Sequence, residues 1–430
     1  MILDTTLQHP KEQIALVIAR IYNRGLTTTS GGNISIIDSE NNIWITPSGI
    51  DKGSLTAKDI ICVKADGSII GNYKPSSEFP FHKAIYEARS DVKAIIHAHP
   101  PALVSFSIVR EIPNTNIISQ AKQICGDIGY AKYELPGSEM LGKEIAAEFI
   151  KGYTAVIMEN HGTVVGGKDL ADAFQRFETL EFCANTIIYG NQIGTPKFLS
   201  NEVIDAFNTQ IPEPLSEMQV VSHESKEREK RTEICNIVHR ACKHGLMITS
   251  YGTVSARWHG NDFLITPTGV SRWDLQPSDI VQIKNGEREP GKIPSRTTYL
   301  HQQIYASHPE INSIILTQSP YLMAFAVTGT KINVRTIPES WIFLKDIEQL
   351  NFGYQYDSAH EIPNWISKEK PLILISNDCA LVVGDGLLQT FDYLEVAEFS
   401  AKSLVMSSSI GKMVPINDEQ TEELRKAFLK

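Results

Sequence analysis

The chain has 430 residues, of which 42% are apolar and 21% are charged, and its formal net charge is −10. This length is large for a single hydrophobic core and predicts two or three domains. The acidic balance provides no basic field for nucleic acid or anionic lipid, and no apolar run reaches the roughly 18 residues of a membrane-spanning helix.

Helices and strands alternate along the first half of the sequence. Apolar residues at helical spacing, followed by a Gly stop, predict a helix over about 9–24. Further on, the patterns predict strands over 33–37, 42–46, 59–65, 92–99 and 154–160, and helices over 82–90, 139–152 and 168–190. Because only turns separate the early strands, we expect them to pair antiparallel. The fold class is therefore α/β, with a mixed or largely antiparallel sheet flanked by helices.

The sequence contains a long internal repeat. Five blocks of the first half return in the second in the same order, at an offset that drifts only from 220 to 217. The clearest are "IWITPSGIDKGSLTAKDIICVKADG" (43–67), repeated as "FLITPTGVSRWDLQPSDIVQIKNG" (263–286), and "AVIMENHGTVVGG" (155–167), repeated as "LILISNDCALVVGD" (372–385). Prolines followed by mixed charge mark a seam near 211–230. We predict one domain over 1–212, a linker over 213–226 and a second domain of the same fold over 227–430.

Two histidines, His97 and His99, end an apolar strand in "AIIHAHP" (94–100). Side chains two apart on a strand point to the same face, so both imidazoles can converge on one metal ion. The alternative is that two histidines at a strand end simply meet solvent. A third histidine, His161, ends another apolar strand, and Glu78 lies in a polar Ser-Ser-Glu turn. Three imidazoles and one carboxylate are a ligand set for a four-coordinate divalent ion.

The second copy provides an internal comparison for these four residues. It carries Leu316, Gln318, Asp378 and Thr297 at the positions of His97, His99, His161 and Glu78. Residues needed only for folding should survive in part, so their loss as a set suggests that they work as a set. His82, in contrast, is matched by His301, and we interpret it as structural.

Three short turns are rich in Gly, Ser and Asn. Such turns often serve only to reverse the chain, but they can also present backbone N–H groups to an anion. If they bind a phosphate near the metal, the candidate residues are Asn33, Ser48, Gly49, Ser76 and Ser77.

The ordered motifs "GGNIS", "ITPSG", "PSSEFPFHKAIY", "IIHAHP" and "ENHG" resemble the class II aldolase/adducin family over most of residues 10–200. The second copy resembles the same three-layer α/β/α fold with the metal site lost. The resemblance implies a divalent metal, usually zinc and otherwise Mn²⁺ or Co²⁺, held by His97, His99 and His161. It implies that Glu78 occupies the metal in the empty enzyme and then acts as the catalytic acid/base. It also places the phosphate of a small sugar phosphate at the three turns.

The expected reaction is cleavage of a phosphorylated ketose through an enediolate, whose charge a divalent ion stabilises as a Lewis acid. The sequence departs from the pattern of the family's aldolases at one place. The segment "EIPNTNIISQAKQ" (111–123) lacks their tyrosine donor and has Ile117 and Ile118 near that position. Decarboxylase, dehydratase and 4-epimerase activities on the same metal site therefore remain alternatives. A non-catalytic, adducin-like interaction module is the alternative from another class.

Partners and location follow from the same observations. We expect a small phosphorylated sugar as substrate, no nucleic acid and no membrane. Aldolases of this family are often tetramers, so a dimer of the duplicated chain could mimic a tetramer. The absence of a signal-peptide pattern and six scattered cysteines without a CxxC pair are typical of a cytoplasmic protein with reduced thiols.

Overall fold

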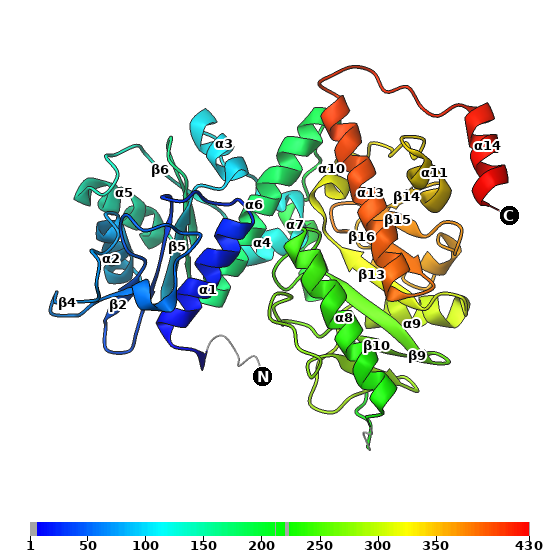
Figure 1. Cartoon of the computed structure of the whole chain (residues 1–430), viewed down its shortest axis with the longest axis horizontal. Coiled ribbons are helices and arrows are strands. Elements are labelled where there is room, and N and C mark those ends of the chain that lie inside the picture. The colour runs from blue at the N-terminus through cyan, green and yellow to red at the C-terminus, as the bar shows by residue number, and fades with distance from the viewer. Residues whose placement is uncertain (1–6, 211, 220–222, 430) are drawn as a thin grey trace. The chain divides into compact units, whose positions relative to one another are not determined.

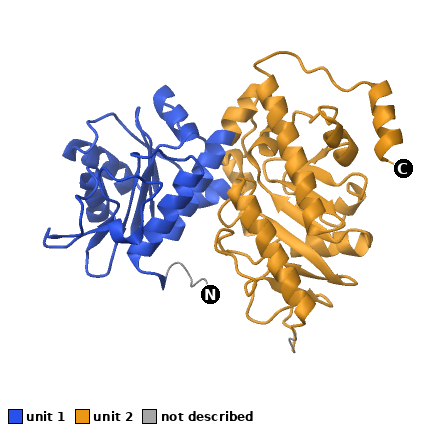
Figure 2. Cartoon of the chain, in the orientation of Figure 1, with its two compact units in different colours: residues 1–115, 120–185 blue, residues 116–119, 186–430 orange. Residues whose placement is uncertain are grey.

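The computed structural model describes residues 7–210, 212–219 and 223–429. It divides into two compact units, Met1–Thr115 with Gln120–Asn185, and Asn116–Ser119 with Thr186–Lys430 (Figure 2). The predicted domain limits at 212 and 227 refer to the two sequence copies and stay a prediction. Residues 220–222 of the predicted linker lie outside the described part of the chain.

Helices and strands of the first copy, some of them labelled in Figure 1, alternate as the sequence predicts. In chain order they are α1 (Pro10–Asn23), β1 (Asn33–Ile37), β2 (Ile43–Ile45), β3 (Ile61–Val63), β4 (Ile69–Ile70), α2 (Phe79–Ala88), β5 (Ala94–Ala98), α3 (Pro101–Val109), α4 (Ser119–Cys125), β6 (Gly129–Ala131), α5 (Glu139–Ile150), β7 (Ala155–Met158), β8 (Thr163–Gly167) and α6 (Leu170–Ile193). The helices α3 and α4 and the strands β4, β6 and β8 were not anticipated.

The sheet of the first copy has eight strands in the order β4-β3-β2-β1-β5-β8-β7-β6. All neighbours pair antiparallel except β6 and β7, which are parallel. The expectation of a mixed, largely antiparallel sheet is confirmed. The central pair, β1 and β5, sets Asn33 opposite His97, so the register brings one of the polar turns to the histidine strand.

Helices cover both faces of this sheet (Figure 1). On one face, α2 and α5 pack Phe81, Ile85 and Phe149 against apolar strand residues in one buried cluster. On the other, α1 buries Ile14, Val17, Ile18 and Ile21. Ile95 belongs to the α2 cluster, so His97, two residues further on, points to that same face. The three-layer α/β/α arrangement is confirmed.

The second copy repeats the architecture with its own eight-stranded sheet, in the order β12-β11-β10-β9-β13-β16-β15-β14. Its elements are α8 (Ser225–Lys243), β9 (Thr253–His259), β10 (Asp262–Ile265), β11 (Val281–Lys284), β12 (Glu287–Arg288), α9 (Thr298–Ser307), β13 (Ser313–Thr317), α10 (Pro320–Thr328), α11 (Pro338–Leu344), β14 (Glu348–Leu350), α12 (Tyr354–Asp357), β15 (Leu372–Ile375), β16 (Cys379–Gly384) and α13 (Leu387–Ser407), with α7 (Asn201–Thr209) before and α14 (Asp418–Phe428) after. Leu316 pairs with Thr253 as His97 pairs with Asn33, which confirms the alignment of the copies.

Two further expectations concern the whole chain. No helix within the described residues is both long enough and apolar enough to cross a membrane. All six cysteines fall in the described part of the chain, and each is buried and free of a disulfide.

Candidate metal centre

Three histidines and one glutamate meet at one end of the first sheet. His97 is the fourth residue of β5 and His99 follows the end of that strand. His161 lies in the turn between β7 and β8, and Glu78 is the residue from which α2 begins. The structure therefore gathers all four predicted ligands, which are up to 83 positions apart in the sequence.

The three imidazoles form a compact triangle. Their ring centroids are 4.7 Å apart for His97 and His99, 5.0 Å for His97 and His161, and 5.1 Å for His99 and His161. One ring nitrogen from each lies within 4.8 Å of the others, an arrangement that could hold a metal ion. Burial, with His97 and His161 adding to it, lowers the pKa of His99 to about 3. His99 is therefore neutral at ordinary pH, as a metal ligand must be.

Hydrogen bonds position the ring of His97 and the backbone of His161. The Nδ1–H group of His97 donates to the carbonyl of Thr163, 2.9 Å away on the neighbouring strand. The backbone N–H of His161 donates to Ser107 Oγ at 3.0 Å, and Ser107 itself donates to the carbonyl of Met158. Asn160, with φ of 51°, turns the chain into this position. Sequence reasoning missed Thr163 and Ser107, because Thr163 is 66 residues from His97 and Ser107 is 54 residues from His161, the histidines that they contact.

Glu78 reaches into the triangle from the helix side. Its Oε2 lies 3.2 Å from His97 Nε2, and its Oε1 lies 3.3 Å from His161 Nε2. Asn33 Nδ2 donates to the same Oε2 at 2.7 Å. Burial alone would raise the pKa of Glu78, but His97 and His161 hold that pKa well below its usual range. The carboxylate is therefore ionised.

The donor set fits a divalent metal. Because His97 uses Nδ1 as its N–H, its Nε2 presents a lone pair, yet that atom faces a carboxylate oxygen, which also has no hydrogen to give. Among the described residues, His97 Nε2, His99 Nε2 and Glu78 Oε1 are buried with no hydrogen-bond partner. Buried polar atoms are almost always satisfied. Three imidazole nitrogens and one carboxylate are zinc ligands, and a cation among them would satisfy all three atoms.

Two glycines make room for His99. A Cβ on Gly162 would lie 2.6 Å from the His99 ring and 2.6 Å from the Ala98 carbonyl oxygen, and one on Gly31 would lie 2.9 Å from His99 Nδ1. The second copy has Cys379 and Tyr251 at these positions, where Gln318 replaces His99. The sequence contains a sign of this role, because the second copy lacks both glycines as well as the histidines.

The predicted phosphate turns lie side by side. Pro47 and Pro75 form a bridge between them, Ser48 N–H donates to the Lys74 carbonyl, and Ser76 N–H donates to the Thr46 carbonyl. The N–H groups of Ser48 and Ser76 are thus used between the turns themselves. Ser48, Gly49 and Ser77 are exposed, and Ser77 directly precedes Glu78 in the chain. Asn33 stands apart, buried against Glu78 and His82.

His82 is fully buried beside this site. Its Nδ1 lies 2.7 Å from Ser35 Oγ, and its Nε2 is hydrogen-bonded to Asn33 Oδ1. Burial, with His97 nearby, lowers the pKa of His82 to about 3. In the second copy, His301 makes the same contact with Ser255.

The ligand positions of the second copy form no such cluster within the described residues. Asp378 accepts a hydrogen bond from Gln355 Nε2 at 2.6 Å, and Thr253 Oγ1 lies 2.7 Å from Ser295 Oγ. Arg296, at the position of Ser77, donates to the carbonyls of Phe207 and Gln210. Asp378, Thr253 and Arg296 therefore make polar contacts with neighbours in their own unit.

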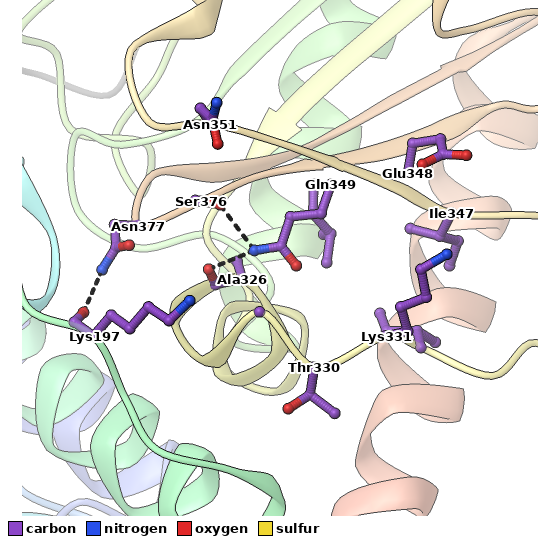
Figure 3. A pocket seen from close by; sticks show the side chains of 13 residues that line it. Lys197, Ala326, Thr330, Lys331, Ile347, Glu348, Gln349, Asn351, Ser376 and Asn377 are labelled. Carbon is purple, nitrogen blue, oxygen red and sulfur yellow. Dashed lines mark hydrogen bonds between the residues drawn. The ribbon is translucent and has the colours of Figure 1, made fainter.

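The second unit contains a different cavity, of about 320 Å³, lined by residues of β14 and β15 and by the segment after α10 (Figure 3). In the first unit, Arg110 and Glu159 form an ion pair at 2.8 Å at the equivalent place. Gly329 and Ser376 replace that pair, which leaves the space open. Its charged lining side chains include the exposed Lys197 and Lys331 together with Glu348, a mixed set to which we assign no ligand.

Comparisons with known proteins agree with this architecture. The model of the class II aldolase and adducin N-terminal domain matches residues 12–188 and again residues 232–405. The 5-deoxy-D-ribulose 1-phosphate aldolase of Bacillus thuringiensis is 33% identical over 203 residues, 46% of this chain and 93% of that protein. The 3-oxo-tetronate 4-phosphate decarboxylase of Haemophilus influenzae is 31% identical over 175 residues, 40% of this chain and 83% of that protein.

Among solved structures, an L-fuculose 1-phosphate aldolase is 30% identical, with a TM-score of 0.42, and the match covers 47% of this chain and 96% of that one. The relatives each correspond in length to one of the two copies, whereas the family model matches both. The chain therefore belongs to the class II aldolase and adducin family, with the family's domain present twice in tandem.

Proposed function

We propose that the chain is a divalent-metal-dependent lyase that cleaves a small phosphorylated ketose, with one active site, in the first unit. The observation that carries the proposal is the convergence of three imidazoles and a carboxylate whose buried lone pairs lack partners. The second copy supports it, because every one of these residues is replaced there while the fold is kept. A similar aldolase acts on a phosphorylated ketose.

The residues divide the work between binding and proton transfer. His97, His99 and His161 would hold the ion, zinc or alternatively Mn²⁺ or Co²⁺, with Glu78 as a further ligand in the empty site. When bound, the ion supplies a Lewis acid that stabilises negative charge on substrate oxygens. Glu78, ionised and oriented by Asn33, accepts the proton of the hydroxyl whose carbon becomes the aldehyde. It then delivers a proton to the carbon left by the cleavage.

The substrate phosphate is proposed to bind at the paired turns. Ser48 and Ser77 offer hydroxyl groups there, and Gly49 lets the backbone approach closely, with φ of 73°. Ser76 supports the turn, since its N–H holds Thr46 and its Oγ accepts from Glu78 N–H at 3.3 Å. Asn33 would donate the second hydrogen of its Nδ2 to the phosphate while the first remains on Glu78.

Decarboxylation of a sugar-acid phosphate is the second candidate. It is supported by the similarity to a 3-oxo-tetronate 4-phosphate decarboxylase and by residues 111–123. Ile117 and Ile118, near the place of the missing tyrosine, are buried and have no side-chain donor. Dehydratase and 4-epimerase activities use the same proposed metal and are distinguished by their products. A non-catalytic adducin-like module would need no metal.

One experiment separates ketose cleavage, decarboxylation and the non-catalytic module. The purified protein is analysed for bound zinc and is assayed against ketose 1-phosphates for release of dihydroxyacetone phosphate, and against 3-oxo-tetronate 4-phosphate for release of CO₂. His97→Leu installs the residue that the second copy carries, so we expect it to fold but to lose the metal and the activity. Leu316→Ala in the second unit is the control and should keep both. Wild-type protein without stoichiometric divalent metal would refute the enzymatic proposal.

We also propose a homodimer located in the cytoplasm. Two copies of a duplicated chain would provide the four domains of a tetrameric aldolase. Light scattering on the purified protein tests the dimer, and a monomer would contradict it.

A further inference from the structure

A chain of buried hydrogen bonds runs from Tyr86 to the proposed acid/base. Tyr86 Oη lies 2.7 Å from Ser35 Oγ, and Ser35 Oγ lies 2.7 Å from His82 Nδ1. His82 Nε2 is bonded to Asn33 Oδ1, and Asn33 Nδ2 lies 2.7 Å from Glu78 Oε2. The other four members of this hydrogen-bond chain are all buried: Tyr86, Ser35, His82 and Asn33.

The carboxylate fixes the direction of every bond. Glu78 only accepts, so the amide of Asn33 must turn its Nδ2 toward the carboxylate and its Oδ1 toward His82. His82 must then carry its proton on Nε2 and accept at Nδ1. Ser35 donates to that nitrogen and in turn accepts from Tyr86. The four donors all point toward Glu78.

The second unit shows how much of this chain the fold itself requires. Tyr305, Ser255 and His301 repeat the first three members, with the same separations of 2.7 Å. His301 is as fully buried as His82. Thr253 and Thr297 replace Asn33 and Glu78, and His301 Nε2 has no hydrogen-bond partner among the described residues. The Nε2 side of the histidine is therefore engaged only in the copy that has the carboxylate.

We propose that His82 is a positioning residue that, by donating from Nε2 to Asn33, fixes the side-chain amide of Asn33 and thereby the orientation of Glu78. Without this donor the amide can rotate by half a turn. Its oxygen would then face the carboxylate oxygen, two acceptors in contact, and Glu78 would be displaced. The inference deepens the proposed function, on which its catalytic readout rests. A histidine with a purely structural role would need only its hydrogen bond to Ser35, which is bonded to Tyr86. His301 has only the equivalent contacts with Ser255 and Tyr305.

The first test needs neither metal nor substrate. ¹⁵N NMR of histidine-labelled protein distinguishes a protonated from an unprotonated ring nitrogen, with His82→Gln used to assign the resonance. We expect His82 with Nε2 protonated and Nδ1 unprotonated. The opposite tautomer would overturn the proposal, because it cannot donate to Asn33. Absence of activity on every ketose phosphate would defeat the proposed function and leave this result standing.

The second test compares matched variants in the two units. His82→Leu and His301→Leu remove equally buried rings with the same Ser and Tyr partners, so their losses of stability should be alike. Loss of an outer partner typically lowers activity about 10- to 100-fold. We expect this fall in kcat for His82→Leu, with KM within about twofold, and no change for His301→Leu. His82→Gln, which keeps a donor near Nε2, should recover most of kcat. Equal kcat in the two leucine variants would overturn the proposal. If the leucine variants fail to fold, His82→Asn against His301→Asn gives the same comparison, because the shorter amide can replace Nδ1 at Ser35 or Ser255 but has no donor at the place of Nε2.

Discussion

Substitution of Gly162 by alanine should weaken metal binding without removing any ligand. The new Cβ would lie 2.6 Å from His99 Cδ2 and from the Ala98 carbonyl oxygen, whereas ordinary contacts begin near 3.4 Å. The carbonyl is held in place, since Ala98 pairs with Thr163 between β5 and β8, so the backbone at residue 162 must shift away from it. The gap between the new Cβ and the His99 ring must also widen by about 0.8 Å to reach ordinary contact, so His161 beside residue 162, the His99 ring or both are displaced. Metal–ligand distances tolerate only about 0.2 Å.

The expected size follows from the cost of overpacking, about 1–3 kcal/mol. If this free-energy cost destabilises only the metal-bound state, the affinity for zinc drops about 5- to 150-fold, since about 1.4 kcal/mol is a factor of ten. Competition with a chelator of known affinity measures the change, and thermal melting in excess chelator shows whether the apoprotein is still folded. Cys379→Ala changes the equivalent position of the second unit and should leave zinc affinity unaltered. A Gly162→Ala protein with wild-type affinity would show that His99 does not bind the metal as proposed.

Two further predictions concern stability. Burial raises the pKa of Glu181 from 4.5 to about 7, so between these values the folded state binds more protons than the unfolded state. The contribution of Glu181 to the free energy of unfolding is therefore greatest below pH 4.5 and falls by about 3 kcal/mol as the pH rises through 7. Urea unfolding at pH 5 and 8 measures this, since the difference in free energy of unfolding between wild type and Glu181→Gln should change between the two pH values. Arg24→Met removes the ion pair to the nearly buried carboxylate of Glu178 and should cost about 3–5 kcal/mol. In the second unit His244 and Glu395 stand at these two positions, and Arg240, one helical turn earlier, adds an exposed ion pair to Glu395. Arg240→Met should therefore cost about 1 kcal/mol or less in the same thermal melts.

Sequence reasoning was strongest where a periodic pattern or the repeat carried the information. The two-residue spacing predicted that His97, in β5, and His99, just after its end, point to one side. The replacement of all four residues in the second copy indicated that they act as a group. Contacts made across the sheet were not accessible in this way. Thr163 holds His97 over a separation of 66 residues, and Ser107 reaches His161 over 54, from a helix that the sequence did not predict.

The prediction for the polar turns could not include contacts across the sheet either. Asn33 was grouped with the phosphate-binding residues by composition, but only the pairing of β1 with β5 shows that it lies opposite His97. Its amide then connects Glu78 to His82. His82 was interpreted as structural because His301 matches it, and a one-letter match cannot show that only one of the two rings uses its Nε2.

The close packing around His99 has a consequence for the history of the duplicated chain. Placing histidines and a glutamate at the four equivalent positions of the second unit would not create the proposed site, because Tyr251 and Cys379 stand at the positions of Gly31 and Gly162. Each substitution would bring no benefit until the others were present. Selection acts on single steps, so the second copy is not expected to acquire such a site in practice. That copy is then free to diverge in whatever role it retains.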